Sequence, residues 1–183
     1  MKTYCILVFS FFIFLFSTDC FSQKPETETK ASNKHSIGAF ISHTYINQGR
    51  IDGELKRLSA PSLGLNYNYI FNDKWSFGLH NDIIIESFIV ESANSEEEFI
   101  ERELPFSTIL VGTYKITESL GVAAGAGVEW EKNANFTVVR LGVEYGLELE
   151  KESLEVLFVF NYDVLVNAYN SFNFGIGINK FFR

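Results

Sequence analysis

The residues that could carry chemistry in this 183-residue chain are charged groups at alternate positions of apolar segments. Arg140 and Asp163 lie in two such segments, joined by a short connection at 150–153. If this connection is a hairpin turn, the register that it sets pairs Arg140 with Asp163 on one face. An enclosed arginine is costly without a carboxylate partner, so we expect an ion pair here, with Glu129 and Glu144 as secondary partners.

Two further groups could act as acids, bases or ligands. The same register pairs Glu148 with Glu155, and paired carboxylates can serve as acid/base catalysts. No nucleophile or cleft motif accompanies them, so we expect no catalytic residue. His80 and Asp82 share one face of their segment, where a hydrogen-bonded pair is favoured over a metal site. The sequence therefore predicts a polar network of Arg140, Asp163, Glu129, Glu144, His80 and Asp82, without metal or cofactor.

The segments that carry these groups alternate with a period of two residues. Leu63, Leu65 and Tyr67 alternate with Gly64 and Asn66, and this period is typical of strands with two different faces. Eight strands are expected, at 35–45, 62–71, 75–90, 104–114, 120–131, 136–149, 154–166 and 172–182. The polar stretches 46–61 and 91–103 are expected as long loops, and only 92–103 could wind briefly into a helix.

The volumes of the two faces predict which one points outward. An eight-stranded barrel is only just wide enough for side chains to fill its interior, so the bulky apolar set must face out and the glycine and charged set must face in. We therefore predict an all-β fold, an antiparallel up-and-down barrel of eight transmembrane strands. A secreted β-sandwich is the alternative, but its outer face should carry charges. Asn81 and His43 are polar exceptions on the outward face, for which a bulge is one explanation.

Aromatic side chains at the strand ends predict two belts at the levels of the lipid headgroups. The expected periplasmic belt is Phe71, Trp75, Tyr114, Tyr145 and Phe182. The expected outer belt is Tyr45, Phe106, Trp130, Phe136 and Phe172.

The N-terminal segment predicts export. One lysine, Lys2, precedes an uncharged apolar run that ends near small residues, a pattern typical of a cleavable signal peptide at 1–22. A polar, flexible periplasmic leader is expected at 23–34 and the barrel at 35–183. Both cysteines, Cys5 and Cys20, lie in the removed segment; acylation of Cys20 is the alternative, although Asp19 before it fits a lipoprotein signal poorly. The net charge of −8 argues against a nucleic-acid partner.

The signal peptide, the eight strands, the glycine alternation GVAAGAGVEWE and the terminal FNFGIGINKFF resemble small outer-membrane β-barrel proteins of the OmpA/OmpX type, in a style similar to Bacteroidota members. The resemblance implies a Gram-negative outer-membrane location. The sequence departs from the family's pattern of a terminal aromatic residue, because Arg183 follows Phe182. Lipid A deacylases of this architecture carry a His-x-Ser motif, and the triplets that begin at His35, His43 and His80 do not match it.

The loops offer the remaining hypotheses. Glutamates crowd the second long loop, at 91, 96, 97, 98, 101 and 103; they could bind divalent cations shared with lipopolysaccharide, dock a basic partner or simply be solvated. The partners expected are outer-membrane lipids, lipopolysaccharide and an envelope protein that contacts the extracellular loops. We expect a non-enzymatic structural or interaction role, as a loop-presenting module or an accessory subunit of an envelope complex. The alternatives are a small-solute porin or transporter and a lipid-modifying enzyme.

Overall fold

The computed structural model describes residues 34–183, except 52–53, 93–94, 133 and 151–152. The expected signal peptide and all of the leader but Lys34 lie outside this part. None of the described residues forms a helix long and apolar enough to cross a membrane. The described residues form ten strands: β1 (His35–Ile51), β2 (Glu54–Ile70), β3 (Trp75–Ile84), β4 (Ser87–Ser92), β5 (Ser95–Glu103), β6 (Phe106–Lys115), β7 (Leu120–Trp130), β8 (Phe136–Glu150), β9 (Leu154–Leu165) and β10 (Asn170–Phe182).

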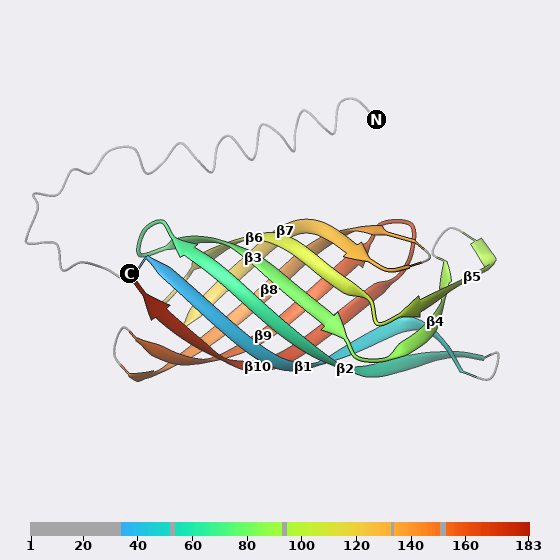
Figure 1. Ribbon diagram of the computed structural model, residues 1–183, viewed down its shortest axis with the longest axis horizontal. Coiled ribbons are helices and arrows are strands. Elements are labelled where there is room, and N and C mark those ends of the chain that lie inside the picture. Colours follow the sequence, from blue (N-terminus) through green and yellow to red (C-terminus); the bar gives the residue numbers. More distant parts are fainter. Residues whose placement is uncertain (1–33, 52–53, 93–94, 133, 151–152) are drawn as a thin grey trace, which may run out of the picture. The chain divides into compact units, whose positions relative to one another are not determined.

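Eight of these strands close into a barrel (Figure 1). Each pairs antiparallel with its neighbour in the order β1-β2-β3-β6-β7-β8-β9-β10, and β10 returns to β1 from His35↔Phe182 to Ile46↔Ser171. The prediction of an all-β, eight-stranded antiparallel barrel is confirmed. The barrel continues to Lys34, whose carbonyl accepts the N–H of Ile70 at 2.7 Å.

The remaining two strands, β4 and β5, form a hairpin beyond the end of the barrel where β3 finishes (Figure 1). The expected third strand at 75–90 is therefore two strands. β3 keeps its pairing with β6 to Ile83↔Phe106. The N–H of Ile85 then donates to the carbonyl of Pro61 at 2.8 Å, and the chain leaves the barrel wall to pair with the extended end of β1, at Gly49↔Val90.

Both expected long loops are wrong for the same reason. Most of 46–61 continues β1 and begins β2, and most of 91–103 forms β4 and β5 instead of a loop or a brief helix. Both segments are rich in polar residues, but they still pair as strands. The expected start of the next strand at Leu104 is also wrong: Leu104 has a positive φ of 46° and Pro105 has no N–H to donate, so β6 begins at Phe106.

The two faces of the barrel wall differ as the volume argument predicts. Outward apolar side chains are exposed, up to 70% for Leu110. Inward polar groups such as Ser36, Asn66 and Arg140 are buried. Asn81 and His43 do face outward, and the pairing of β2 with β3 around Asn81 has no bulge. Each makes a local hydrogen bond: the side-chain amide of Asn81 donates to the carbonyl of Leu65 at 3.2 Å, and His43 Nδ1 lies 3.3 Å from the hydroxyl of Ser59.

The interior has its apolar core at the end that carries the hairpin. β4 contributes Phe88 and Val90, which pack with residues of the barrel wall and of the β9–β10 connection. The cluster consists of Ile46, Ala60, Ile84, Phe88, Val90, Ile109, Val111, Ala123, Val138, Leu165, Ala168 and Tyr169. The hairpin thus covers this mouth of the barrel with its inner face.

Candidate functional site

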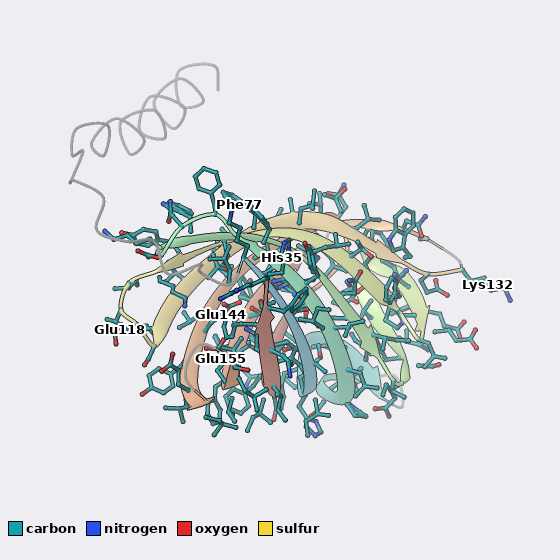
Figure 2. The ribbon with its side chains drawn as sticks, turned by 60° about the vertical axis from the view of Figure 1, so that its left-hand side comes forward. His35, Phe77, Glu118, Lys132, Glu144 and Glu155 are labelled. Carbon is teal, nitrogen blue, oxygen red and sulfur yellow. The ribbon has the colours of Figure 1, made fainter. Side chains whose placement is uncertain are left out.

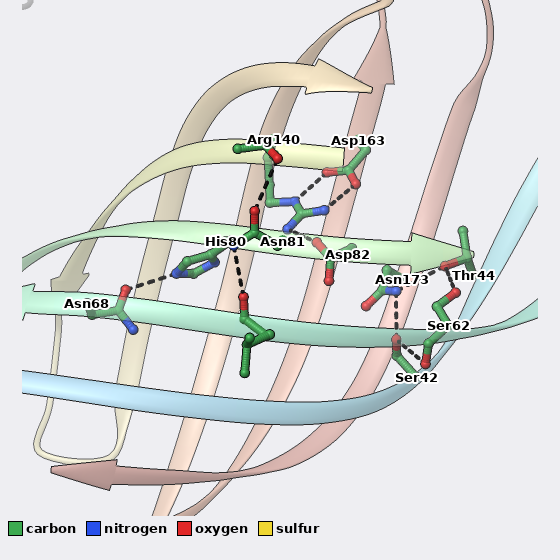
Figure 3. Close-up of polar contacts among 12 residues, drawn as sticks. Ser42, Thr44, Ser62, Asn68, His80, Asn81, Asp82, Arg140, Asp163 and Asn173 are labelled. Carbon is green, nitrogen blue, oxygen red and sulfur yellow. Dashed lines mark hydrogen bonds and ion pairs between the residues drawn. The ribbon is translucent and has the colours of Figure 1, made fainter. Parts of the chain in front are cut away.

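The centre of the lumen is crossed by an ion-pair bridge around Arg140 of β8 (Figure 3). Its guanidinium holds Asp163 with two hydrogen bonds, from Nε and from Nη2, each of 2.7 Å. Its Nη1 donates to Asp82 at 2.7 Å. Asp82 is on β3 and Asp163 on β9, which lie opposite each other in the strand order of the closed barrel. The bridge therefore spans the lumen from wall to wall.

The structure brings Arg140 and Asp163 together in the register that the short turn predicts, Arg140↔Asp163. The second partner differs from the expectation. It is Asp82, and neither Glu129 nor Glu144 has a hydrogen bond or ion pair with Arg140 in the part of the chain that the structure describes. A hairpin register relates neighbouring strands only, so it does not reveal a contact across the barrel.

The expected His80–Asp82 pair is replaced by a pair between neighbouring strands. His80 Nε2 lies 2.9 Å from the Oδ1 of Asn68, a diagonal neighbour on β2, since His80 is directly opposite Asn66. Alternate residues of a strand are about 7 Å apart, which leaves Asp82 free to reach Arg140 instead. Buried hydroxyls and an amide fill the lumen nearby, where Asn173 donates to Ser42 and Thr44, each at 3.0 Å (Figure 3).

A second charged cluster, which sequence reasoning missed, fixes the hairpin on the barrel mouth. Arg102 of β5 is fully buried. It donates from Nη2 to Glu129 of β7 at 2.6 Å and from Nη1 to the carbonyl of Ala134 at 2.6 Å, and Nη1 lies 3.4 Å from Glu131. Its guanidinium also lies over the ring of Phe136, 4.9 Å from the centroid. Glu129 thus pairs with Arg102 and not with Arg140.

Phe136 consequently differs from its prediction as an outer-belt aromatic. It packs against the interior core and under Arg102, because inward positions of β8 are even-numbered, as at Val138 and Arg140. The other nine expected belt residues are exposed or half-buried. Several pair across strands, such as Trp75 with Tyr114, whose ring centroids are 4.9 Å apart.

Tyr169, in the connection between β9 and β10, completes the second cluster. Its hydroxyl lies 2.9 and 2.8 Å from the two oxygens of Glu129. Its ring meets that of Phe88 edge to face, with centroids 5.8 Å apart. Burial, and then the negative charge of Glu129, raise the pKa of the Tyr169 hydroxyl well above its usual value. The hydroxyl therefore stays a hydrogen-bond donor at neutral pH. We name Arg102, Glu129, Glu131, Phe136 and Tyr169 the mouth cluster.

The opposite end of the lumen contains a cavity of about 60 Å³, whose lining includes the charged and amide side chains of Glu144, Glu155, Lys115 and Asn179 (Figure 2). Asn179 donates to Glu155 at 2.8 Å. Glu148 is opposite Glu155 in register, but its side chain is exposed. The two carboxylates therefore do not share one enclosed site. In the described part of the chain, no three histidine, cysteine or carboxylate side chains group as a metal site.

A closed eight-stranded antiparallel wall with an apolar exterior and a polar interior is the fold of the small outer-membrane β-barrels. Solved structures agree at the level of fold. The chain is similar to the outer membrane protein OprG from Pseudomonas aeruginosa, with 14% identity and a TM-score of 0.53 over 83% of this chain and 97% of that one.

The chain is also similar to Ail, the attachment invasion locus protein of Yersinia pestis, with 14% identity and a TM-score of 0.52 over 82% of this chain and 99% of that one. Neisserial surface protein A matches with 14% identity and a TM-score of 0.52 over 81% and 97%. No protein-family model and no curated protein matches the sequence.

Proposed function

We propose that this protein is an integral outer-membrane barrel with a closed, non-conducting interior, which presents the β4–β5 hairpin and the extended ends of β1 and β2 to a partner in the cell envelope. Its role is structural or interactive, as an accessory subunit or anchoring module, and not enzymatic. The apolar exterior supports insertion into a bilayer. The barrel strands have at least 10 residues, enough for the roughly 9–11 that a tilted strand needs to cross the hydrocarbon.

The observation that carries the proposal is the double closure of the lumen. The Arg140 bridge joins opposite walls at the centre, and buried Arg102 ties the hairpin to β7 at the mouth. A hydrated ion that passed through would have to break charge-assisted hydrogen bonds at two levels, and each such bond contributes more than a neutral one. The same ties hold the hairpin in one orientation, which favours recognition by a partner.

Conductance in planar bilayers tests the closed interior. The wild-type protein should give no current above background. Arg140→Ala combined with replacement of the β4–β5 hairpin by a short turn should give measurable current, whereas either change alone should leave one closure and little current. Discrete channels in the wild-type protein would favour the porin alternative. Recovery of the protein in the soluble periplasmic fraction would contradict membrane insertion itself.

The charge of the hairpin indicates the type of partner. Segment 91–103 contains six glutamates and one arginine, so a basic protein surface is favoured by electrostatic complementarity. One structure of Ail is a complex with the heparin analogue sucrose octasulfate. A polysulfated ligand of that kind would be repelled by this hairpin.

Affinity capture from the native outer membrane in mild detergent tests the partner. A stoichiometric protein should be retained by the wild-type chain and lost when the six hairpin glutamates become glutamine. Glu118→Gln, in the exposed β6–β7 connection, is the matched control and should retain it. Equal capture by both variants would exclude the hairpin as the contact. A change in the mass of lipid A on expression would instead favour the lipid-modifying alternative.

A further inference from the structure

A groove of about 900 Å³ lies on the outward face of the barrel. Two rows of outward side chains line it, and within each row the residues are direct partners on successive strands. One row is Val156, Ile178, Ala39, Leu65 and Asn81. The other row is Ile176, Ile41, Leu63, Ile83 and Phe106.

The hollow exists because one residue in these rows is small. Ala39 stands between Leu65 and Ile178 in the register, and the larger side chains around it form the sides. The floor reaches the backbone at Gly64 and Gly177. The groove is thus narrow, and it runs across the strands and not along them.

The groove runs obliquely over the apolar outer surface, from the hairpin end of the barrel towards the opposite end. Phe106, at the end of the groove nearer the hairpin (its upper end), is paired with Trp130 near the mouth of the barrel. Val156, at its lower end, is close to the start of β9. From Val156 to Phe106 the groove crosses six strands, which at about 4.8 Å apart give a length of about 24 Å. The groove is therefore longer than the roughly 15 Å that one leaflet contributes to the hydrocarbon core, so an extended acyl chain can lie along it.

The upper end also contains a polar pair with an unused donor. The hydroxyl of Thr108 donates to the Oδ1 of Asn81 at 3.1 Å, and the Nδ2 of Asn81 donates to the carbonyl of Leu65 at 3.2 Å (Figure 3). In the described part of the chain, the second N–H of this amide has no acceptor. An unpaired N–H that faces hydrocarbon is costly, so an oxygen from a ligand would be stabilised at this position.

We infer that this groove binds one acyl chain of an ester-linked membrane lipid, whose ester carbonyl accepts the free N–H of Asn81. The inference rests on the proposed location in the outer membrane. A flexible chain fits a groove one side chain wide that is apolar along its length and polar at the headgroup end. The convex wall of a second barrel would touch only its rims.

Native mass spectrometry of the full chain in detergent micelles tests the groove, with ester-linked phosphatidylethanolamine as the probe. The wild-type protein should retain one lipid, and Ala39→Leu, which fills the hollow, should reduce retention at least tenfold. Ala124→Leu is the matched control, because Ala124 is an exposed outward alanine outside the groove. It should retain the lipid like the wild-type protein.

The ether-linked analogue, which lacks the carbonyl, tests Asn81. The wild-type protein should prefer the ester by about fivefold, the usual worth of one hydrogen bond, and Asn81→Leu should abolish this preference. Loss of retention in Ala39→Leu without any ester preference would overturn the role of Asn81. Undiminished retention in Ala39→Leu, or equal loss in Ala124→Leu, would overturn the groove as the binding site.

Dimers of the wild-type chain that Ala39→Leu converts to monomers, without loss of lipid, would assign the groove to a second copy and overturn the inference. Folding is followed separately by the heat-dependent shift of the barrel in gels. A variant that still shows this shift has kept its barrel, so a failure of lipid binding and a failure of membrane insertion are distinguishable.

Discussion

Substitution of Arg102 by methionine should release the β4–β5 hairpin from the barrel mouth without unfolding the barrel. Methionine keeps an unbranched apolar stem but removes the contacts to Glu129 and to the carbonyl of Ala134, each 2.6 Å long. Removing one member of a buried ion pair costs about 3–5 kcal/mol. We take the lower end, about 3 kcal/mol, because the Tyr169 hydroxyl still donates to the remaining carboxylate. At about 1.4 kcal/mol per tenfold, the open population should rise roughly 100-fold.

The measurement is amide hydrogen exchange of β4 and β5 in detergent micelles, with the barrel strands as an internal reference, because exchange reports local opening. Glu101→Gln, an exposed change on the same strand, should alter exchange little. Adding Glu129→Gln to Arg102→Met should cost less than the two single changes together, since the residues are coupled. A change below threefold in the hairpin, or equal acceleration in hairpin and barrel, would refute the assignment of Arg102 as the tie.

Three further changes test the interior. Arg140→Met should destabilise the barrel by about 3–5 kcal/mol, measured by urea unfolding in micelles; an unchanged midpoint would contradict the bridge. Burial raises the pKa of Tyr169, so the folded state keeps a proton that the unfolded chain loses near pH 10. The stabilising effect of Tyr169 should therefore be fully present below about pH 10 and be lost progressively as the pH rises from there towards the raised pKa. The loss should appear as faster hairpin exchange than in Tyr169→Phe, and identical pH profiles of the two proteins would contradict this. In Gly127→Ala, the new Cβ would collide with the backbone carbonyl of Thr108. The substitution should lower the free energy of unfolding by about 1–3 kcal/mol, measured by thermal denaturation. In the control Gly112→Ala, the new Cβ would lie 3.4 Å from its nearest neighbour, so the loss in the free energy of unfolding should be far smaller.

The barrel could be predicted from the sequence because its constraints are local. Alternation at Leu63, Leu65 and Tyr67 reports which face of β2 points outward, whatever its neighbours are. The Arg140–Asp163 pair was equally accessible, because a short turn sets the register of its two strands. In both cases the information lies within one strand or one hairpin.

The mouth cluster could not be predicted in the same way. Arg102 reaches residues on β7 and in the β7–β8 connection, and it lies in a segment so rich in glutamate that it reads as a solvated loop. The available signal was the alternation of inward Phe88 and Val90, together with Ile100 and Arg102 two residues apart. The length of this alternation, a few residues on each strand, is too short to outweigh the composition around it.

The pairing of β1 with β10, from His35↔Phe182 to Ile46↔Ser171, has a consequence for the order of events during biogenesis. The first barrel strand to be synthesised has no permanent neighbour on one edge until the last one exists, so the wall cannot be completed while the chain is still being made. Contacts between such distant parts of a sequence are slow to form, and an unpaired strand edge promotes aggregation in the meantime. Maturation of this protein should therefore depend on factors that shield the chain until its C-terminal strand can close the ring.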